Sequence, residues 1–358
     1  MQDAATNVSA AKRLANSRLA NNELQAALYW FRHAASLGSA DALEHALRLQ
    51  LRLEGRLATA HWLQHIQPSL ALSPSGTLLA ELGLWPIDDS SSVLGWQSAA
   101  GCALVLQPVI SQAQGERTWQ SLMLAWQQDP QLTKLPVCFK PVLRFNSTEL
   151  NCTEQLGQRI NCNYAALTST VMTTQFQQLV VIAGRGIASY NNGILQLPDN
   201  AGLPLFRHEF MHIAGFLDEY LLSPVAAKAI CQPGKFAPNL LIGNDPETLQ
   251  RYLLHYAVRE NEVTLTAVPT CEAVGLQAYR PVAAINTMRH FEAGLPDLYE
   301  KLLLQVMQKP AEIMPVQYYF AYLARQKEDW QQWLQLMQAA ATLGYPPAQH
   351  VLRDLTED

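Results

Sequence analysis

The sequence has few charged residues and no long apolar run. Charged side chains make up 15% of its 358 residues, below the roughly 25% that is usual for soluble domains. Its 25 Lys and Arg do not outnumber its 30 Asp and Glu, so the basic excess of nucleic-acid-binding proteins is absent and we expect no nucleic-acid partner. The longest apolar stretches, such as residues 179–184, fall far short of the roughly 18–20 residues that span a bilayer. We therefore expect no transmembrane segment.

Several common motifs are missing as well. The sequence contains no CxxC pair, no P-loop, no GxGxxG after a strand and no GxSxG, so it indicates neither a zinc ribbon, nor a nucleotide-binding fold, nor a serine hydrolase. Intrinsic disorder is excluded because 49% of the residues are hydrophobic and the net charge is only -5. The length suggests about two domains.

The cysteine pattern points to an oxidising compartment. An even number of cysteines is present, at positions 102, 138, 152, 162, 231 and 271, which predicts disulfides. We expect Cys231–Cys271 and one pair within Cys138, Cys152 and Cys162; the alternative is a set of buried free thiols in a cytosolic protein. The first residues lack the basic and apolar regions of a signal peptide. We expect a periplasmic or secreted bacterial protein whose signal peptide is absent from this sequence.

Both ends of the chain have helical spacing and share a short pattern. Residues 8–66 are rich in Ala and Leu, with Asn22 and Ser39 as N-cap types and Gly55 as a C-terminal stop. The pattern Ala-Ala-x-Leu-Gly at 34–38 recurs at 340–344. These segments resemble short tetratricopeptide-like repeats, in which small residues let helices approach closely. We predict helical regions at 1–73 and 311–358 that pack together, and a core at 93–310.

The middle of the chain has the pattern of a core that contains both strands and helices. Apolar runs predict strands at 103–110, 137–145, 179–184 and 193–197. Amphipathic spacing predicts helices at 116–128 and 205–214. The order of strand, helix and further strands, followed by a helix, is typical of an α/β or α+β core.

The second of these helices carries the sequence HExxH. His208 and His212 are four residues apart, so both imidazoles lie on one face of a helix and can bind one zinc ion. Glu209 follows the first histidine, where its carboxylate can take a proton from water activated by the ion. Gly215 can turn the chain out of the helix and bring Asp218 back as a third ligand. Three protein ligands with one open position are typical of a catalytic zinc site.

The complete string HExxHxxGxxD resembles the metzincin metallopeptidases, in the variant with Asp in place of the third His. Its ending, Asp218-Glu219-Tyr220, is similar to that of the IgA-peptidase-type metallopeptidases, in which the spacing from the second His is one residue longer. This difference leaves Glu219 as an alternative third ligand, and we expect Asp218. The resemblance covers roughly residues 100–310 and implies an α+β fold, in which a metzincin-like core with a mixed β-sheet carries an active-site helix.

A second stretch adds to the resemblance. Residues 279–290 are similar to the YRP…MR segment that closes the site in IgA-peptidase-type enzymes. Met288 would then pack beneath the metal ligands. His290 stands where some metzincins place a Tyr that stabilises the transition state; it takes that part or lies exposed. The strand with Gly193, Ile194 and Leu195 would be the edge strand that pairs with an extended substrate, or an ordinary edge strand.

These expectations define two alternative functions. The first is a zinc-dependent metallopeptidase, a monomer with one catalytic Zn²⁺, acting on peptide or protein substrates with Glu209 as general base. The second is a helical-repeat protein-interaction module whose metal site is vestigial or structural and whose helical ends bind a protein partner. The intact Glu209 argues against a vestigial site, because a structural zinc has no need of a general base.

Overall fold

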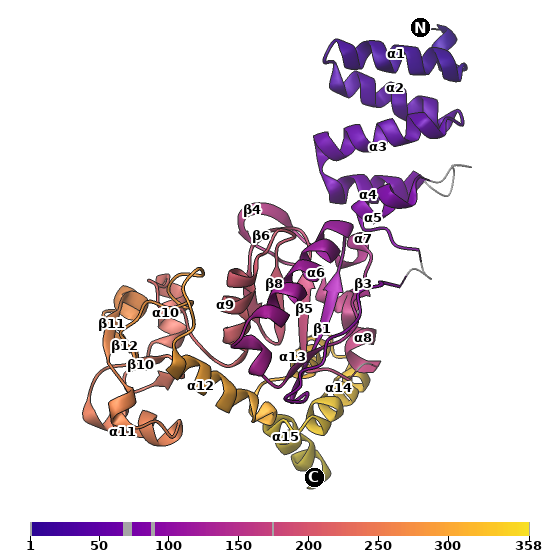
Figure 1. The fold of residues 1–358 in the computed structure, drawn as a ribbon. Coiled ribbons are helices and arrows are strands. Elements are labelled where there is room, and N and C mark those ends of the chain that lie inside the picture. The colour runs from indigo at the N-terminus through magenta and orange to yellow at the C-terminus, as the bar shows by residue number, and fades with distance from the viewer. Residues whose placement is uncertain (1, 67–73, 87–89, 174, 358) are drawn as a thin grey trace.

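The computed structural model describes residues 2–66, 74–86, 90–173 and 175–357, in which helices flank an α+β core (Figure 1). The N-terminal helices stack one after another at one end. They are η1 (Gln2–Ala5), α1 (Val8–Ala20), α2 (Leu24–Ser36), α3 (Ala40–Glu54), α4 (Arg56–Ile66) and α5 (Gly76–Leu82). Fully buried alanines such as Ala34 and Ala42 lie between α2 and α3, as the repeat-like pattern predicts.

The predicted helix ends of this region are partly confirmed. The Ser39 hydroxyl caps α3 by accepting the Ala42 N–H, and Gly55 ends that helix at a φ of +87°. Asn22 is not an N-cap. It has a φ of +59° in the turn, and Glu23 holds the cap position of α2. Asn tolerates the left-handed region, so it serves the turn.

The central sheet has the strand order β2-β1-β5-β8-β7, with β3 also pairing with β1. Only β7 runs antiparallel to its neighbour. The strands are β1 (Leu104–Ile110), β2 (Val137–Phe139), β3 (Leu143–Arg144), β5 (Gln178–Ile182), β7 (Ser189–Asn191) and β8 (Ile194–Leu197). The predicted strand at 137–145 is therefore wrong as one strand. It breaks at Pro141, which has no N–H to continue the ladder.

Helices cover both faces of this sheet. On one face lie α6 (Ala113–Gln128) and α9 (Leu203–Ile213), whose aromatic side chains pack on Val180 and Ile182. On the other lie α8 (Thr168–Thr173), α13 (Val316–Gln326), α14 (Trp330–Thr342) and α15 (Pro346–Glu357). Because β5 is covered on both sides, its five residues are all buried, as expected of parallel strands.

The C-terminal helices do not pack with the N-terminal ones, contrary to the prediction. They form one core with the sheet, through Phe320, Leu336 and Ala340, and Figure 1 shows the two ends of the chain on opposite sides of the core. The shared pattern reflects similar local helix pairing. It does not bring the two copies together, because each copy has its own apolar partner surface.

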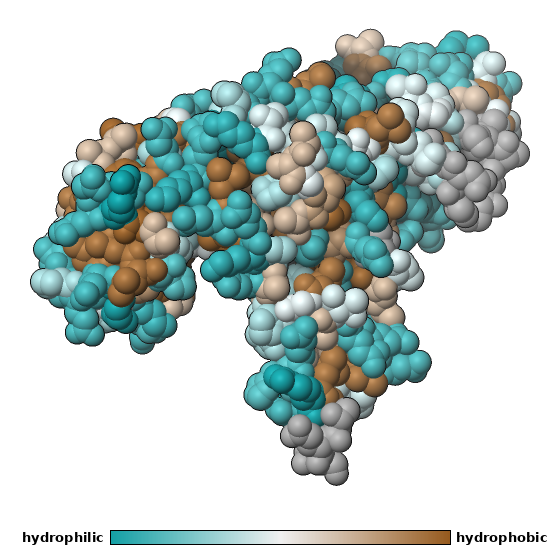
Figure 2. Space-filling view, turned by 60° about the horizontal axis from the view of Figure 1, so that its bottom comes forward, coloured by the Kyte–Doolittle hydropathy of each residue, from teal (hydrophilic) through white to brown (hydrophobic). Residues whose placement is uncertain are grey.

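A smaller lobe follows α9, built on the sheet β11-β12-β10-β9. Its elements are α10 (Pro224–Ile230), β9 (Phe236–Ala237), β10 (Leu240–Ile242), α11 (Pro246–His255), η5 (Glu260–Glu262), β11 (Thr266–Val268), η6 (Pro269–Val274) and β12 (Ala278–Arg280). The helix α12 (Asp297–Met307) leads back to the C-terminal helices, through η7 (Pro310–Glu312). The lobe projects separately from those helices, with a hollow between them (Figure 2).

A two-stranded flap lies beside the central sheet. Strand β4 (Glu154–Arg159) pairs with β6 (Arg185–Ile187). Three further short helices belong to the core. These are α7 (Ser147–Leu150), η4 (Tyr164–Leu167) and η3 (Leu132–Lys134). The side chain of Arg56 on α4 is ion-paired with Glu154 of the flap. This pair ties the N-terminal helices to the flap.

All six cysteines are paired, so free thiols are excluded. The disulfides are Cys102–Cys138, Cys152–Cys162 and Cys231–Cys271. The predicted pair Cys231–Cys271 is confirmed, as is one pair within the cluster of three. Within the described residues, no helix is long and apolar enough to cross a membrane.

Candidate metal centre

The helix α9 carries the two histidines and the glutamate that the sequence singles out. Phe206 and Phe210 pack against Trp126 in the core, with ring centroids 5.6 and 5.1 Å away. Because this face anchors α9 to the sheet, His208 and His212 are held in a fixed position on the helix. Their imidazole centroids are 4.9 Å apart, which confirms the predicted pairing on one face.

A tight turn after α9 brings Asp218 to the histidines. Gly215 has a φ of +79°, and the Phe216 N–H closes the turn onto the Met211 carbonyl. The Asp218 Oδ1 then lies 3.2 Å from His208 Nε2 and 3.4 Å from His212 Nε2. A tetrahedral ion with bonds of roughly 2.0–2.1 Å sets its ligand atoms roughly 3.3 Å apart. Both distances from the Asp218 oxygen therefore match the spacing of metal ligands.

Backbone carbonyls fix the orientation of both imidazoles. His208 Nδ1 lies 2.9 Å from the Thr287 carbonyl, and His212 Nδ1 lies 2.7 Å from the Phe216 carbonyl. A carbonyl only accepts, so each Nδ1 carries the proton and each Nε2 presents a lone pair to the site. Metal-binding histidines are commonly held in this way.

The acceptor atoms of His208, His212 and Asp218 point at one another, and no hydrogen-bond donor of the described residues lies between them. Ligand atoms of His208, His212 and Asp218 all lie within 4.8 Å of one another, and the buried Asp218 Oδ1 accepts no hydrogen bond. Lone pairs that face one another are satisfied by a cation. The group can thus hold a metal ion, and its imidazoles and carboxylate are of the type that bind zinc.

The surroundings shift the pKa values of the acidic groups in opposite directions. Burial raises the pKa of Glu209, although the nearby His212 and His208 oppose this. The same burial acts on Asp218, but the nearby His208 and His212 hold its pKa below the usual range. Asp218 is therefore kept as an anion, whereas Glu209 is shifted towards a role in proton transfer.

Glu219 is not a metal ligand, and this alternative is wrong. Its side chain is fully buried away from the histidines. It accepts hydrogen bonds from the Tyr299 hydroxyl at 2.5 Å, Asn286 Nδ2 at 2.8 Å and Asn239 Nδ2 at 3.0 Å. Its backbone N–H also donates to the Met288 carbonyl. Glu219 therefore ties the turn after α9 to the segment that contains Met288.

Met288 lies near the site, as predicted. It is fully buried in the core cluster that includes Met211 and Phe216. The preceding residue, Thr287, provides the carbonyl that holds His208. The Met288 segment thus supports the ligand helix from below without presenting a group to the cleft.

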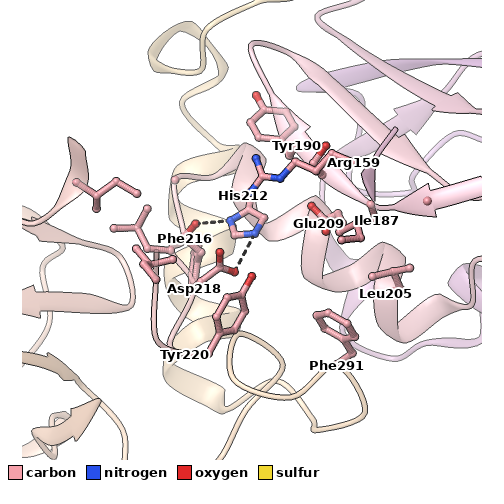
Figure 3. A pocket seen from close by; sticks show the side chains of 17 residues that line it. Arg159, Ile187, Tyr190, Leu205, Glu209, His212, Phe216, Asp218, Tyr220 and Phe291 are labelled. Atoms are coloured by element: carbon pink, nitrogen blue, oxygen red, sulfur yellow. Dashed lines mark hydrogen bonds and ion pairs between the residues drawn. The ribbon is translucent and has the colours of Figure 1, made fainter. Parts of the chain in front are cut away.

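His290 does not reach the site. It is exposed and does not line the cleft, whereas its neighbour Phe291 does, with its ring centroid 4.6 Å from that of His208. Tyr220 lines the cleft instead, and its hydroxyl lies beside Asp218 (Figure 3). Burial, and then the charge of Asp218, raise the pKa of Tyr220. Tyr220 therefore stays neutral and can donate a hydrogen bond. Its position two residues after Asp218 is the sequence feature from which it could have been predicted.

The strand predicted as the edge of the sheet is not the edge, because its neighbour takes that position. Ile194 and Leu195 belong to β8, which pairs with β5 on one side and β7 on the other. Gly193 lies in the connecting turn, where it and Asn192 both have positive φ. Asn-Gly is a strong signal of a two-residue hairpin, and this hairpin makes β7 the edge of the sheet. Residues of β7 line the cleft.

The cleft extends to both sides of His212. One part has a volume of about 520 Å³ and contains Glu209, Asp218 and Tyr220 (Figure 3). A second cavity of about 680 Å³ lies between the small lobe and the start of the C-terminal helices. The two share Tyr190, His212 and Gly215. The candidate site therefore lies midway along a groove that is longer than one side chain.

Comparison of the chain with family models, curated proteins and solved structures finds no match.

Proposed function

We propose that the protein is a zinc-dependent metallopeptidase with a metzincin-like core. The observation that carries this proposal is the convergence of His208, His212 and Asp218 on one point beside a buried Glu209. A purely structural metal site requires neither the glutamate nor an open cleft. Both are present here, because Glu209 lines the same cleft as His212 and Asp218.

The chain's own residues supply binding and proton transfer. Bound zinc would lower the pKa of water and polarise the peptide carbonyl. Glu209 accepts the proton of the attacking water and later gives it to the leaving amine. Burial raises its pKa, which makes the first of these transfers easier, because the carboxylate is then a stronger base. Tyr220 donates a hydrogen bond to the oxygen that becomes negative in the transition state.

The free edge of β7 supports a peptide as the substrate. Its outer side lacks a paired strand among the described residues, and Ser189 and Tyr190 face the cleft. An extended peptide can pair its backbone with such an edge. The groove beyond His212 gives room for side chains on both sides of the bond to be cleaved.

A glutamine substitution at Glu209 tests the proposal. Glu209→Gln keeps the ligands but cannot accept a proton, so peptide hydrolysis should fall by roughly 10²–10⁴-fold while a full zinc equivalent is retained. Glu260→Gln, at an exposed carboxylate outside the cleft, serves as control and should cleave like the parent. Cleavage of a peptide library by the parent should also stop with a chelator and return with zinc.

The same experiment addresses the alternative of an interaction module. Zinc content without chelator-sensitive cleavage of any library peptide would favour a structural metal and a binding role for the helical ends. No observation on those helices identifies a partner. The three disulfides support the further proposal that the protein works in an oxidising compartment, periplasmic or extracellular.

A further inference from the structure

Arg159 is a positively charged side chain directed into the catalytic cleft. It is the last residue of β4, and Figure 3 shows its side chain reaching towards His212 beside Tyr190 and Glu209. Among the described residues that line this part of the cleft, it is the only Lys or Arg. The two acidic groups there, Glu209 and Asp218, already have roles. Arg159 is thus a charge that the proposed mechanism does not use.

The guanidinium of Arg159 is available to a ligand. Across the part of the chain that the structure describes, no carboxylate lies within 4.0 Å of it, and no acceptor is hydrogen-bonded to it. It lines the same cleft as Glu209 and Tyr220. It is therefore close to the reacting groups without being paired to them.

The flap holds Arg159 on a well-supported base. The disulfide Cys152–Cys162 closes the loop that contains β4, and the ion pair between Glu154 and Arg56 fixes its start. At Gly186 the two flap strands approach so closely that a Cβ atom would lie 2.6 Å from the Gln158 carbonyl. The backbone that carries Arg159 is thus held in place beside the cleft.

We infer that Arg159 is a specificity-determining residue that binds a carboxylate of the substrate peptide. The inference rests on the proposed peptidase function and adds the substrate class. A guanidinium binds a carboxylate through two parallel hydrogen bonds. Leu205, Ile187 and Phe291 give this side of the cleft apolar walls, which strengthen the interaction by excluding water. The carboxylate is supplied by the C-terminus of the peptide or by an Asp or Glu side chain.

Binding of matched peptides tests this inference without requiring turnover. Zinc-loaded Glu209→Gln protein is titrated with three versions of one peptide: with Glu and a free C-terminus, with Glu and a C-terminal amide, and with Gln and a free C-terminus. We expect loss of the recognised carboxylate to weaken binding at least about tenfold. The amide version identifies the C-terminal carboxylate as its source, and the Gln version identifies a side chain.

Two arginines of the flap provide matched variants. Adding Arg159→Gln should abolish the difference between the peptides, and Arg159→Lys should restore part of it because a point charge cannot bind bidentately. Arg185→Gln, in the other strand of the flap and outside the cleft lining, should leave the difference unchanged. Circular dichroism checks that each variant is folded.

The outcomes separate this inference from the proposed function. Equal binding of all three peptides, or a preference that persists in Arg159→Gln, overturns the role of Arg159 even if the parent hydrolyses peptides. A carboxylate preference that depends on Arg159 supports it even if the parent hydrolyses nothing, in which case the peptidase proposal is the one rejected.

Discussion

Asp218 and Glu219 are adjacent in the chain, yet their carboxylates have entirely different partners. Asp218 lies 3.2 Å from His208 Nε2, while Glu219 is buried against Tyr299, Asn239 and Asn286. One carboxylate completes the candidate metal centre. The other, Glu219, links the turn after α9 to the segment that contains Met288.

This division predicts opposite effects of two neighbouring substitutions. Asp218→Ala should lose zinc, because it removes a ligand, and should leave the fold intact. Glu219→Gln should retain zinc but lower the free energy of unfolding by about 1–3 kcal/mol, because its amide group replaces an oxygen that accepts buried hydrogen bonds. Metal analysis and denaturant unfolding measure the two properties. A zinc-free Glu219→Gln variant that unfolds like the parent would contradict the assignment.

Tyr220 and His290 can be distinguished by kinetics. Tyr220→Phe removes the neutral hydroxyl beside Asp218 and should lower kcat by roughly 10²–10³-fold with little change in KM. His290→Ala, at an exposed position outside the cleft lining, should leave both constants unchanged. If the histidine variant is the impaired one, the original expectation from the sequence is correct and the placement of the donor must be revised.

The hairpin that forms the sheet edge depends on Gly193. Its φ is +82°, and a Cβ atom there would lie 2.8 Å from the Cα of Val316 on α13. Gly193→Ala should therefore cost more than the roughly 1–2 kcal/mol of a left-handed residue, since a backbone must also move. Gly275→Ala is the control, because its φ is +72° but nothing lies within 4 Å of its added Cβ. The free energy of unfolding of both variants is measured with denaturant. The loss in Gly275→Ala gives the cost of backbone strain alone, and the additional loss in Gly193→Ala gives the cost of the contact with Val316.

The stability of the small lobe should depend on pH through Glu262. Hydrogen bonds from the Arg259 backbone and from the side chains of Lys301 and Arg259 lower the pKa of Glu262 from 4.5 to about 2. A depressed pKa in the folded state means that the stabilisation is present above the ordinary pKa and is lost as the pH falls from about 4.5 towards 2. The parent should be more stable than Glu262→Gln at pH 7, and this difference should disappear on acidification. A difference that persists unchanged at low pH would exclude the carboxylate as its cause.

Local spacing determined much of the candidate site. The four-residue interval between His208 and His212, and the glycine between them and Asp218, specify a helix and a turn that need few distant contacts. For the same reason the strand at 179–184 was predicted from its own apolar residues, and it corresponds to β5. Cys231 and Cys271 were paired correctly as well.

Features set by distant contacts were missed. The two Ala-rich segments look alike but pack on different surfaces, and His290 lies outside the cleft because Phe291 occupies its rim. The edge strand was misplaced because the hairpin at Asn192 and Gly193 adds β7 beyond β8. Arg159 was not found at all, because a flap brings it over the site from about fifty residues before the histidines.

By itself, then, the sequence determined the two histidines of the donor set and favoured Asp218 as the third member, since helix periodicity and one flexible glycine direct these side chains to one point. The tertiary structure decided which neighbouring side chains face that point. The sequence favoured Asp218 and left Glu219 as an alternative. Glu219 is held away from the metal centre by the buried hydroxyl of Tyr299, the two asparagine amides and the guanidinium of Arg280. A buried carboxylate goes where donors are available, and the chain brings those donors from positions 20 to 80 residues away.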